Sequence, residues 1–107
     1  MGYHIFKIKI KEVKMKFENG CNSVEIINYI YDKSGLRIEY SLYETKFKVH
    51  GRRIYSICIT SKYNNIIESV FTSDISRFKP QAIYIFKTLC KNTVTPCTLN
   101  DVLENIL

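Results

Sequence analysis

Short polar turns divide the first two thirds of the chain into segments whose side chains alternate between polar and apolar. A period of two is typical of β-strands with one buried face. The connections are too short for the crossovers that parallel strands need, so consecutive strands must run antiparallel, which predicts a meander of about four to five strands. The turn sequences that separate them are ENGCNS, DKSG, VHGRR and Asn64-Asn65.

The predicted strands differ in how regular their alternation is. Residues 6–17 alternate with one slip of phase at Lys11, which predicts a strand with a bulge. The next long run, residues 36–49, changes parity between Tyr43 and Lys46, which predicts a second bulge. Further strands are predicted over residues 24–31, 54–63 and 66–72, with a hairpin around Gly51.

The period changes to that of a helix after residues 73–76. Asp74 is expected in the turn that leads into this helix. Pro80 must lie in the first helical turn, because deeper in the helix it would remove a hydrogen bond. The helix is predicted to end near Asn92 and to bury a stripe that comprises Phe78, Ala82, Ile85, Phe86, Leu89 and Cys90.

The C-terminal residues predict a short second helix. Thr95-Pro96 matches an N-cap followed by proline at the first helical position, and Thr98 with Asp101 offers an alternative start. Such a short helix is unstable alone in water, so its apolar stripe must dock on something. It closes the core of its own domain, or it docks into a partner or a second copy. The stripe consists of Leu99, Val102, Leu103, Ile106 and Leu107.

These patterns predict the fold class. We expect residues 1–107 to form a single α+β domain. In this domain an antiparallel sheet is covered on one face by the first helix, and the terminal helix closes an edge or an end.

The chain carries a formal net charge of +6, and its lysines could form a basic face on the sheet. With Tyr40, Tyr43 and Tyr55 nearby, such a face would suit single-stranded nucleic acid. The competing interpretation is a solvated face whose tyrosine rings pack inward. Arginine, the usual reader of phosphates and bases, is scarce, and no RNP-type motif is present. The basic set comprises Lys7, Lys9, Lys14, Lys16, Lys46, Lys48, Arg52 and Arg53.

The cysteines favour a reducing compartment and argue against a metal. They are scattered without close pairs, which is typical of reduced cytoplasmic thiols. Structural zinc sites favour two cysteines two to four residues apart, and Cys90 and Cys97 are farther apart than that. No apolar run approaches the ~20 residues that cross a bilayer. We therefore expect a cytoplasmic protein with no cofactor, metal or membrane partner.

No catalytic motif is present in the sequence. His4 and His50 lie near the start and in a turn, where solvated side chains are common. Glu39 and Glu44 are expected to face solvent. Cys58 could be a reactive thiol, although a cysteine within a strand is more often a small buried apolar residue.

The C-terminal part of the chain resembles a known family. SDIS followed by a helix, and the ending KNTVTPCTLNDVLENIL, are similar to the signature of small proteins from anaerobic spore-forming Gram-positive bacteria, classed as a domain of unknown function. The resemblance covers about residues 36–107. It departs from the family at Phe78-Lys79-Pro80, where acidic residues are expected. It implies the same architecture and brings no assigned activity.

Three possible functions remain, and they are ranked from the most to the least favoured. The first is a non-enzymatic cytoplasmic protein-interaction module, with self-association as one form of the interaction. It ranks first because the apolar residues are used for packing and no chemical site is assembled. The alternative is a nucleic-acid-binding domain that uses the basic face. The third is a small enzyme or ligand carrier, which would require a pocket with converging polar groups.

Overall fold

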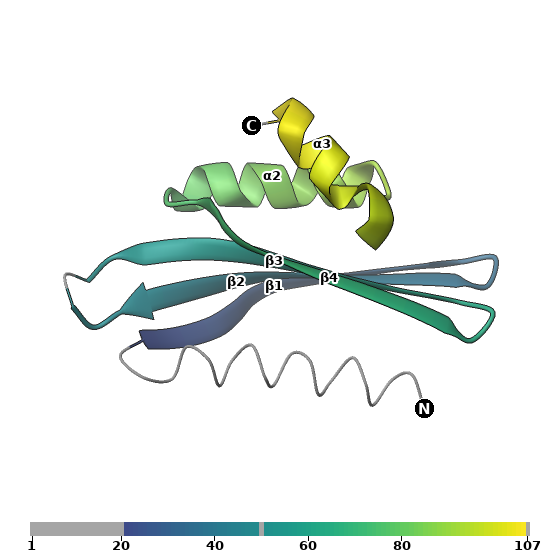
Figure 1. Cartoon of the computed structure of the whole chain (residues 1–107), viewed down its shortest axis with the longest axis horizontal. Coiled ribbons are helices and arrows are strands. Elements are labelled where there is room, and N and C mark those ends of the chain that lie inside the picture. Colours follow the sequence, from purple (N-terminus) through teal and green to yellow (C-terminus); the bar gives the residue numbers. More distant parts are fainter. Residues whose placement is uncertain (1–20, 50, 107) are drawn as a thin grey trace.

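The computed structural model describes residues 21–49 and 51–106. Its four strands form one sheet in the order β1-β2-β3-β4, and each pairs antiparallel with the next. Two helices and a 3₁₀ turn follow (Figure 1), so the α+β meander predicted from sequence is confirmed. The strand predicted over residues 6–17 lies outside the described residues. The elements are β1 (Cys21–Lys33), β2 (Leu36–Phe47), β3 (Arg53–Tyr63), β4 (Ile66–Ser76), α2 (Lys79–Lys91), η1 (Pro96–Thr98) and α3 (Leu99–Ile106).

Two of the hairpin turns use left-handed backbone conformations. Ser34 and Gly35 join β1 to β2 with φ of 56° and 81°, and Asn64 and Asn65 join β3 to β4 with φ of 49° and 66°. Two central residues with positive φ define the turn whose twist matches that of the flanking strands. The Asn-Asn and Ser-Gly pairs therefore make tight hairpins, as the sequence predicted.

The bulge predicted between Tyr43 and Lys46 is wrong. β2 pairs with β3 without interruption from Arg37 to Lys46. The irregularity lies on the neighbouring strand, where Glu25 pairs with Tyr43 but the next pair is between Ile27 and Leu42. The inserted residue Ile26 packs against the same core as Ile27. The parity change seen in the sequence beyond Tyr43 has another origin: Val49 lies in the turn and is 67% exposed, so it belongs to no buried face.

A second bulge lies in β4, where the sequence predicted only a turn. Tyr55 pairs with Ser76 and Ile57 pairs with Thr72, so three residues of β4 face a single residue of β3. Asp74 sits in this bulge with a φ of 56°. The strand resumes after it and ends at Ser76, so Asp74 lies within β4 rather than in the turn before the helix.

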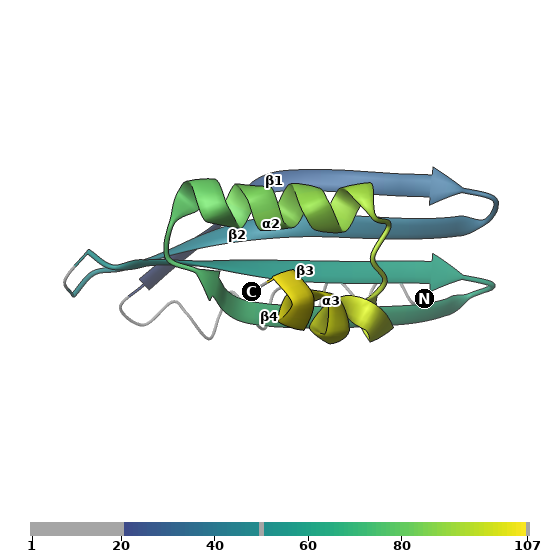
Figure 2. The same cartoon turned by 90° about the horizontal axis from the view of Figure 1, so that it is seen from above.

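Both helices lie on one face of the sheet (Figure 1). Viewed from above, α2 lies over β1 and β2, and α3 lies over β3 and β4 (Figure 2). The core between the layers is predominantly apolar, and its most deeply buried strand and helix residues are Ile38, Tyr40, Leu42, Ile57, Ile59, Ala82, Ile85, Phe86, Leu89 and Leu99.

α2 begins close to its predicted position. Pro80 lies in the first turn, as predicted. Phe78 was expected on the buried stripe and is instead 71% exposed. It is the N-cap residue, with an extended backbone of φ −111° and ψ 123°, so its side chain leaves the helical face that Ala82 and Phe86 occupy.

The end of α2 connects the helical layer to the sheet. The N–H of Val94 donates to the carbonyl of Leu89 at 3.1 Å, and the N–H of Thr93 donates to the carbonyl of Cys90 at 3.2 Å. These are the two bonds of a Schellman motif, with Thr93 at φ 52° where glycine is usual. The carbonyl of Val94 then accepts a bond from the buried hydroxyl of Tyr40 at 2.9 Å.

The terminal helix starts at the first of the two predicted positions. Thr95 is the N-cap of η1 and Pro96 occupies its first turn. The N–H of Thr95 donates to the hydroxyl of Thr98 at 3.3 Å. η1 continues directly into α3 at Leu99, so the two form one continuous helical segment.

Candidate functional site

β1 combines a position at the edge of the described sheet with several exposed apolar side chains. β1 is an edge strand of 13 residues, and no described strand pairs with its outer side. Between positions 24 and 31 it reads VEIINYIY, with neither lysine nor proline. Val24 is 56% exposed, Tyr29 46% and Ile30 40%. We call residues 24–31 the β1 edge.

Proteins usually protect long edge strands with lysine, proline or a covering element. The opposite edge of this sheet follows that rule, because the bulge at Asp74 breaks β4 and η1 contacts it. Among the described residues, the bulge at Ile26 is the one interruption of the β1 edge. Beyond this bulge, residues 27–33 pair regularly with β2 and leave an uninterrupted outer side.

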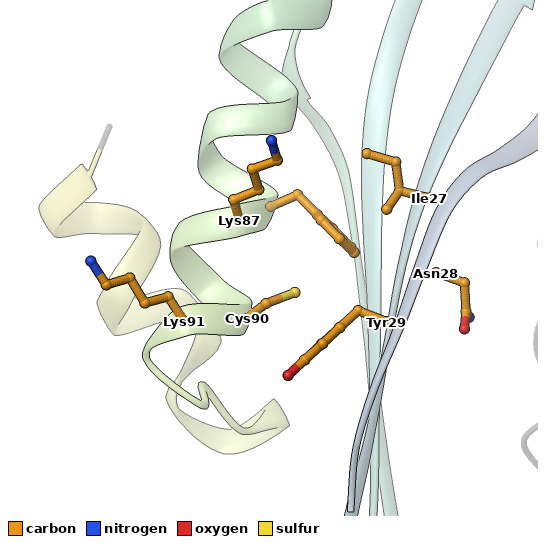
Figure 3. A pocket seen from close by; sticks show the side chains of 7 residues that line it. Ile27, Asn28, Tyr29, Lys87, Cys90 and Lys91 are labelled. Atoms are coloured by element: carbon orange, nitrogen blue, oxygen red, sulfur yellow. The ribbon is translucent and has the colours of Figure 1, made fainter.

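A groove of about 390 Å³ opens between the β1 edge and α2. Ile27 and Tyr29 line it from the strand, and Cys90 lines it from the helix (Figure 3). Phe86 of α2 also lines it. The stems of Lys87 and Lys91 form its outer rim. We call this feature the α2 groove.

The parity of β1 determines which side chains reach the α2 groove. Tyr29 pairs with Tyr40, and their rings lie 6.0 Å apart between centroids. Tyr40 lies in the main core beneath the helices, so Ile27 and Tyr29 share that face. Asn28 points to the other side of the strand (Figure 3), where its amide donates to Glu39 at 2.9 Å and to Ser41 at 3.1 Å.

The α2 groove is apolar in character at neutral pH. Burial raises the pKa of the Cys90 thiol to about 12, so Cys90 stays protonated and is a poor nucleophile. Phe86 is 2% exposed and forms the inner wall. The groove therefore offers apolar surface inside and two ammonium groups outside.

The second face of the sheet, opposite the helices, has a different composition. Tyr43 and Cys58 are buried there and pack against Phe71. Around them, hydroxyl groups pair across the strands, such as Thr60 with Ser69 at 2.9 Å. Burial raises the pKa of the Cys58 thiol, so the structure favours the interpretation of Cys58 as a small apolar residue.

Four members of the predicted basic set lie among the described residues. The described members lie at the end of the sheet formed by the β2–β3 hairpin, where they are exposed, and the guanidinium of Arg52 lies 5.1 Å from the ring centroid of Phe47. These members are Lys46, Lys48, Arg52 and Arg53. The remaining members, Lys7, Lys9, Lys14 and Lys16, lie outside the described residues.

The tyrosines grouped with this basic set are buried. Tyr40 is 0% exposed, Tyr55 2% and Tyr43 4%. Tyr40 and Tyr55 lie in the helix-covered core, whereas Tyr43 lies on the second face. None of these rings offers a free surface on which a base could stack.

The apolar stripe of the terminal helix faces the core to different degrees. Leu99 is 0% exposed and Leu103 is 6% exposed, and both belong to the main core. Val102 and Ile106 pack against that core while half-buried. Leu107 lies outside the described residues.

The carboxylates that were expected to face solvent are half-buried. Glu44 accepts a hydrogen bond from the hydroxyl of Tyr55 at 2.7 Å. Glu39 accepts one from Asn28. His4 and His50 lie outside the described residues. Across residues 21–49 and 51–106, no group of three or more histidine, cysteine or acidic side chains is placed to hold a metal ion. Neither described helix has the length and apolar character needed to cross a membrane.

Sequence reasoning did not identify the β1 edge or the α2 groove. The signal for the edge was present, because VEIINYIY lacks the lysines that interrupt residues 6–17. No sequence pattern indicates the α2 groove, because the groove depends on where α2 crosses the sheet.

Comparisons with known proteins extend the resemblance found at the C-terminus. Neither the curated proteins nor the solved structures contain a match to this chain. The match to a family of unknown function, DUF6514, covers residues 15–107 and includes all the described elements. The chain therefore belongs to the DUF6514 family.

Proposed function

We propose that this protein is a non-enzymatic protein-interaction module whose binding surface is the β1 edge. The observation that carries the proposal is the exposure of Val24, Tyr29 and Ile30 on an edge strand whose outer side pairs with no strand of residues 21–49 or 51–106. The scattered cysteines support a cytoplasmic location. The resemblance of the C-terminal segment supports an origin in anaerobic spore-forming Gram-positive bacteria.

The binding mode that fits this edge is strand addition. An extended segment alongside β1 would pair with its outer N–H and C=O groups and become a fifth strand. Main-chain hydrogen bonds supply affinity in this mode, and pockets for alternate side chains supply specificity. Self-association through the same edge would be one form of this interaction.

Paired lysine substitutions test this proposal. Val24→Lys with Ile30→Lys places two charges on the β1 edge. The matched control, Val49→Lys with Ile66→Lys, adds the same charges at a valine and an isoleucine that are 67% and 64% exposed elsewhere. The probes are extended peptides of about nine residues, selected for binding to the wild-type protein from a randomised library.

We expect the edge variant to bind the selected peptides about tenfold more weakly, which corresponds to two lost cross-strand pairs at ~0.7 kcal/mol each. The control should bind them as the wild type does. Affinities would be measured by fluorescence anisotropy, and circular dichroism would verify that both variants fold. Equal binding by the two variants would exclude the β1 edge as the interaction surface.

Nucleic-acid binding is the second candidate, and the basic end of the β2–β3 hairpin favours it. Lys46, Lys48, Arg52 and Arg53 are exposed together there. Phosphate contacts make affinity fall steeply with ionic strength. Binding of single-stranded oligothymidine that weakens with salt, and that is lost on charge reversal at Lys48 and Arg52, would support this function. Binding that survives this reversal would exclude the hairpin, and charge reversal at Lys7, Lys9 and Lys14 would then test the rest of the set.

A further inference from the structure

We infer that the segment which adds to the β1 edge is an extended peptide of another protein, with apolar side chains at alternate positions and an acidic residue beside them. The inference rests on the proposed function and specifies its partner. It is drawn from the α2 groove, which lies directly beside the strand that the peptide would pair with.

The apolar requirement follows from the parity of the sheet. Successive side chains of an added strand would point alternately to the two faces, and strands pair about 4.8 Å apart. Every second side chain would therefore lie beside Ile27 and Tyr29, beneath α2. There it would contact Phe86 and Cys90, whose exposed surfaces in the groove are apolar. Apolar side chains at these positions would cover the surface that the groove leaves open to water.

The requirement for an acidic residue follows from the two lysines at the rim of the α2 groove. Lys87 and Lys91 are four residues apart on α2, so they project from the same side of the helix. Both are exposed, and no ion pair joins either of them to an acidic side chain of residues 21–49 or 51–106. Their stems line the groove while their ammonium groups extend away from its centre (Figure 3). Such flexible stems allow the ammonium groups to turn toward a carboxylate at the mouth of the groove.

The same lysines argue against a second copy as the occupant. A two-fold axis between two antiparallel β1 strands would place both helical layers on the same side of one continuous sheet. α2 lies over β1 and β2, so the α2 helices of the two copies would flank this axis (Figure 2). Lys87 and Lys91 of each copy would then face the same lysines of the other. The charge of +6 on each copy adds a further repulsion, whereas an acidic peptide would be attracted.

The test uses the full chain and peptides selected from the randomised library. The selected sequences are read for composition, and the location of each peptide is determined from the slowed hydrogen exchange of β1 amides by NMR. Affinities are then compared for Lys87→Glu with Lys91→Glu and for a matched control, Lys48→Glu with Lys79→Glu. The control reverses two exposed lysines outside the α2 groove and changes the net charge equally.

We expect the selected peptides to carry Asp or Glu between alternate apolar residues and to protect the β1 amides from hydrogen exchange. Reversal of Lys87 and Lys91 should weaken their binding about tenfold, and the control should change it less than twofold. Peptides that protect β1 but show no acidic preference, or that bind both variants equally, would overturn the inference and leave the proposed function standing. Selected peptides that protect other parts of the chain would overturn both, and so would β1 amides that are already protected in the free monomer by pairing with residues 6–17. Concentration-dependent dimers that protect β1 in the absence of peptide would identify a second copy as the occupant and would overturn the inference alone.

Discussion

Tyr40 illustrates how a single side chain connects the two layers of this molecule. Its ring is fully buried beneath α2, and its hydroxyl donates to the carbonyl of Val94 at 2.9 Å. That carbonyl lies beyond the end of α2, where no N–H group of the helix can donate a hydrogen bond to it. Burial raises the pKa of Tyr40, with the nearby Cys90 as a smaller cause. The bond therefore depends on a tyrosine that remains protonated.

The pKa shifts of Tyr40, Tyr43 and Cys90 predict alkaline sensitivity. All three pKa values are raised in the folded protein, chiefly by burial. When folding raises the pKa of a group, the folded protein holds the proton more tightly than the unfolded chain does. The resulting stability is fully present below the pKa of the unfolded state, and it is lost as the pH rises toward the pKa of the folded state. The unfolded values are about 8.5 for cysteine and about 10 for tyrosine. The melting temperature should therefore be steady near neutral pH and fall progressively above about pH 9.

Melting curves at several pH values would check this prediction. Cys90→Ala removes one of the titrating groups, so its melting temperature should fall less steeply than that of the wild type between about pH 9 and pH 12. The exposed Cys97 provides the control, and Cys97→Ala should follow the wild type. A melting temperature that does not change up to pH 11 would contradict the prediction.

Thr93 holds a strained conformation at the end of α2. It is a β-branched residue with a φ of 52°, where a side chain costs about 1–2 kcal/mol. Thr93→Gly should remove this strain, although glycine gains entropy in the unfolded chain. We expect a net stabilisation of about 0.5–1 kcal/mol, measured by urea unfolding. Thr93→Ala retains the Cβ atom and should recover less of this free energy, and equal effects of the two substitutions would argue against backbone strain.

At the scale of elements, the two helices differ in how well the sequence predicted them. α2 was predicted within one or two residues, because its apolar spacing and Pro80 specify both the face and the start. The start of the terminal segment at Thr95 was also correctly included among the alternatives. The wrong assignment at Phe78 arose because periodicity cannot show where the backbone first becomes helical. Residues on either side of an N-cap have different side-chain directions although their spacing continues.

Substitution of Leu103 would show how strongly the stability of α3 depends on its contacts with the core. It is 6% exposed and packs in the main cluster, so Leu103→Asp would place a carboxylate among apolar side chains. We expect a loss of roughly 3–5 kcal/mol of unfolding free energy, measured by chemical denaturation. Asn105→Asp is the control, because this exposed position lies on the same helix. If Leu103→Asp leaves the melting temperature unchanged but dissociates an oligomer, the stripe of α3 is a docking surface.

The two edge strands show how local sequence and tertiary context combine. β4 contains Asp74 in a left-handed bulge, which interrupts its outer side. β1 has its bulge at Ile26, where it brings Ile26 and Ile27 against the same core. The sequence predicted a bulge in β2 between Tyr43 and Lys46, where the pairing with β3 is uninterrupted. The parity change behind that prediction included Val49, which lies in the turn beyond β2, so it did not indicate a register shift.

At the scale of the whole molecule, the sheet is protected unevenly. β2 and β3 are central strands, and eight consecutive residues of β3, Ile54–Ser61, are buried. β1 is mostly exposed, with no described strand on its outer side. The helical layer covers one face and leaves the α2 groove open beside β1. Within the part of the chain that the structure describes, the least protected part of the sheet is therefore the part that the proposed partner would cover.

This unevenness predicts a gradient of amide exchange. Amides of β2 and β3 should exchange only through global unfolding, and the outward amides of the β1 edge should exchange orders of magnitude faster. Native-state hydrogen exchange followed by NMR would measure both rates in one experiment. Uniform protection of β1, β2 and β3 in the monomer would contradict an open edge.

Local sequence patterns were sufficient to predict the antiparallel meander, the turns at Gly35 and Asn64-Asn65, and the apolar faces of the two helices. These features follow from local rules, because backbone sterics and side-chain period act over a few neighbouring residues. Long-range packing, in contrast, places the bulge at Ile26, brings the hydroxyl of Tyr40 to Val94, and orients α2 across the sheet so that a groove remains beside β1. Each of these depends on how side chains from distant segments fill a common space, and close packing between layers is not encoded in the periodicity of either layer.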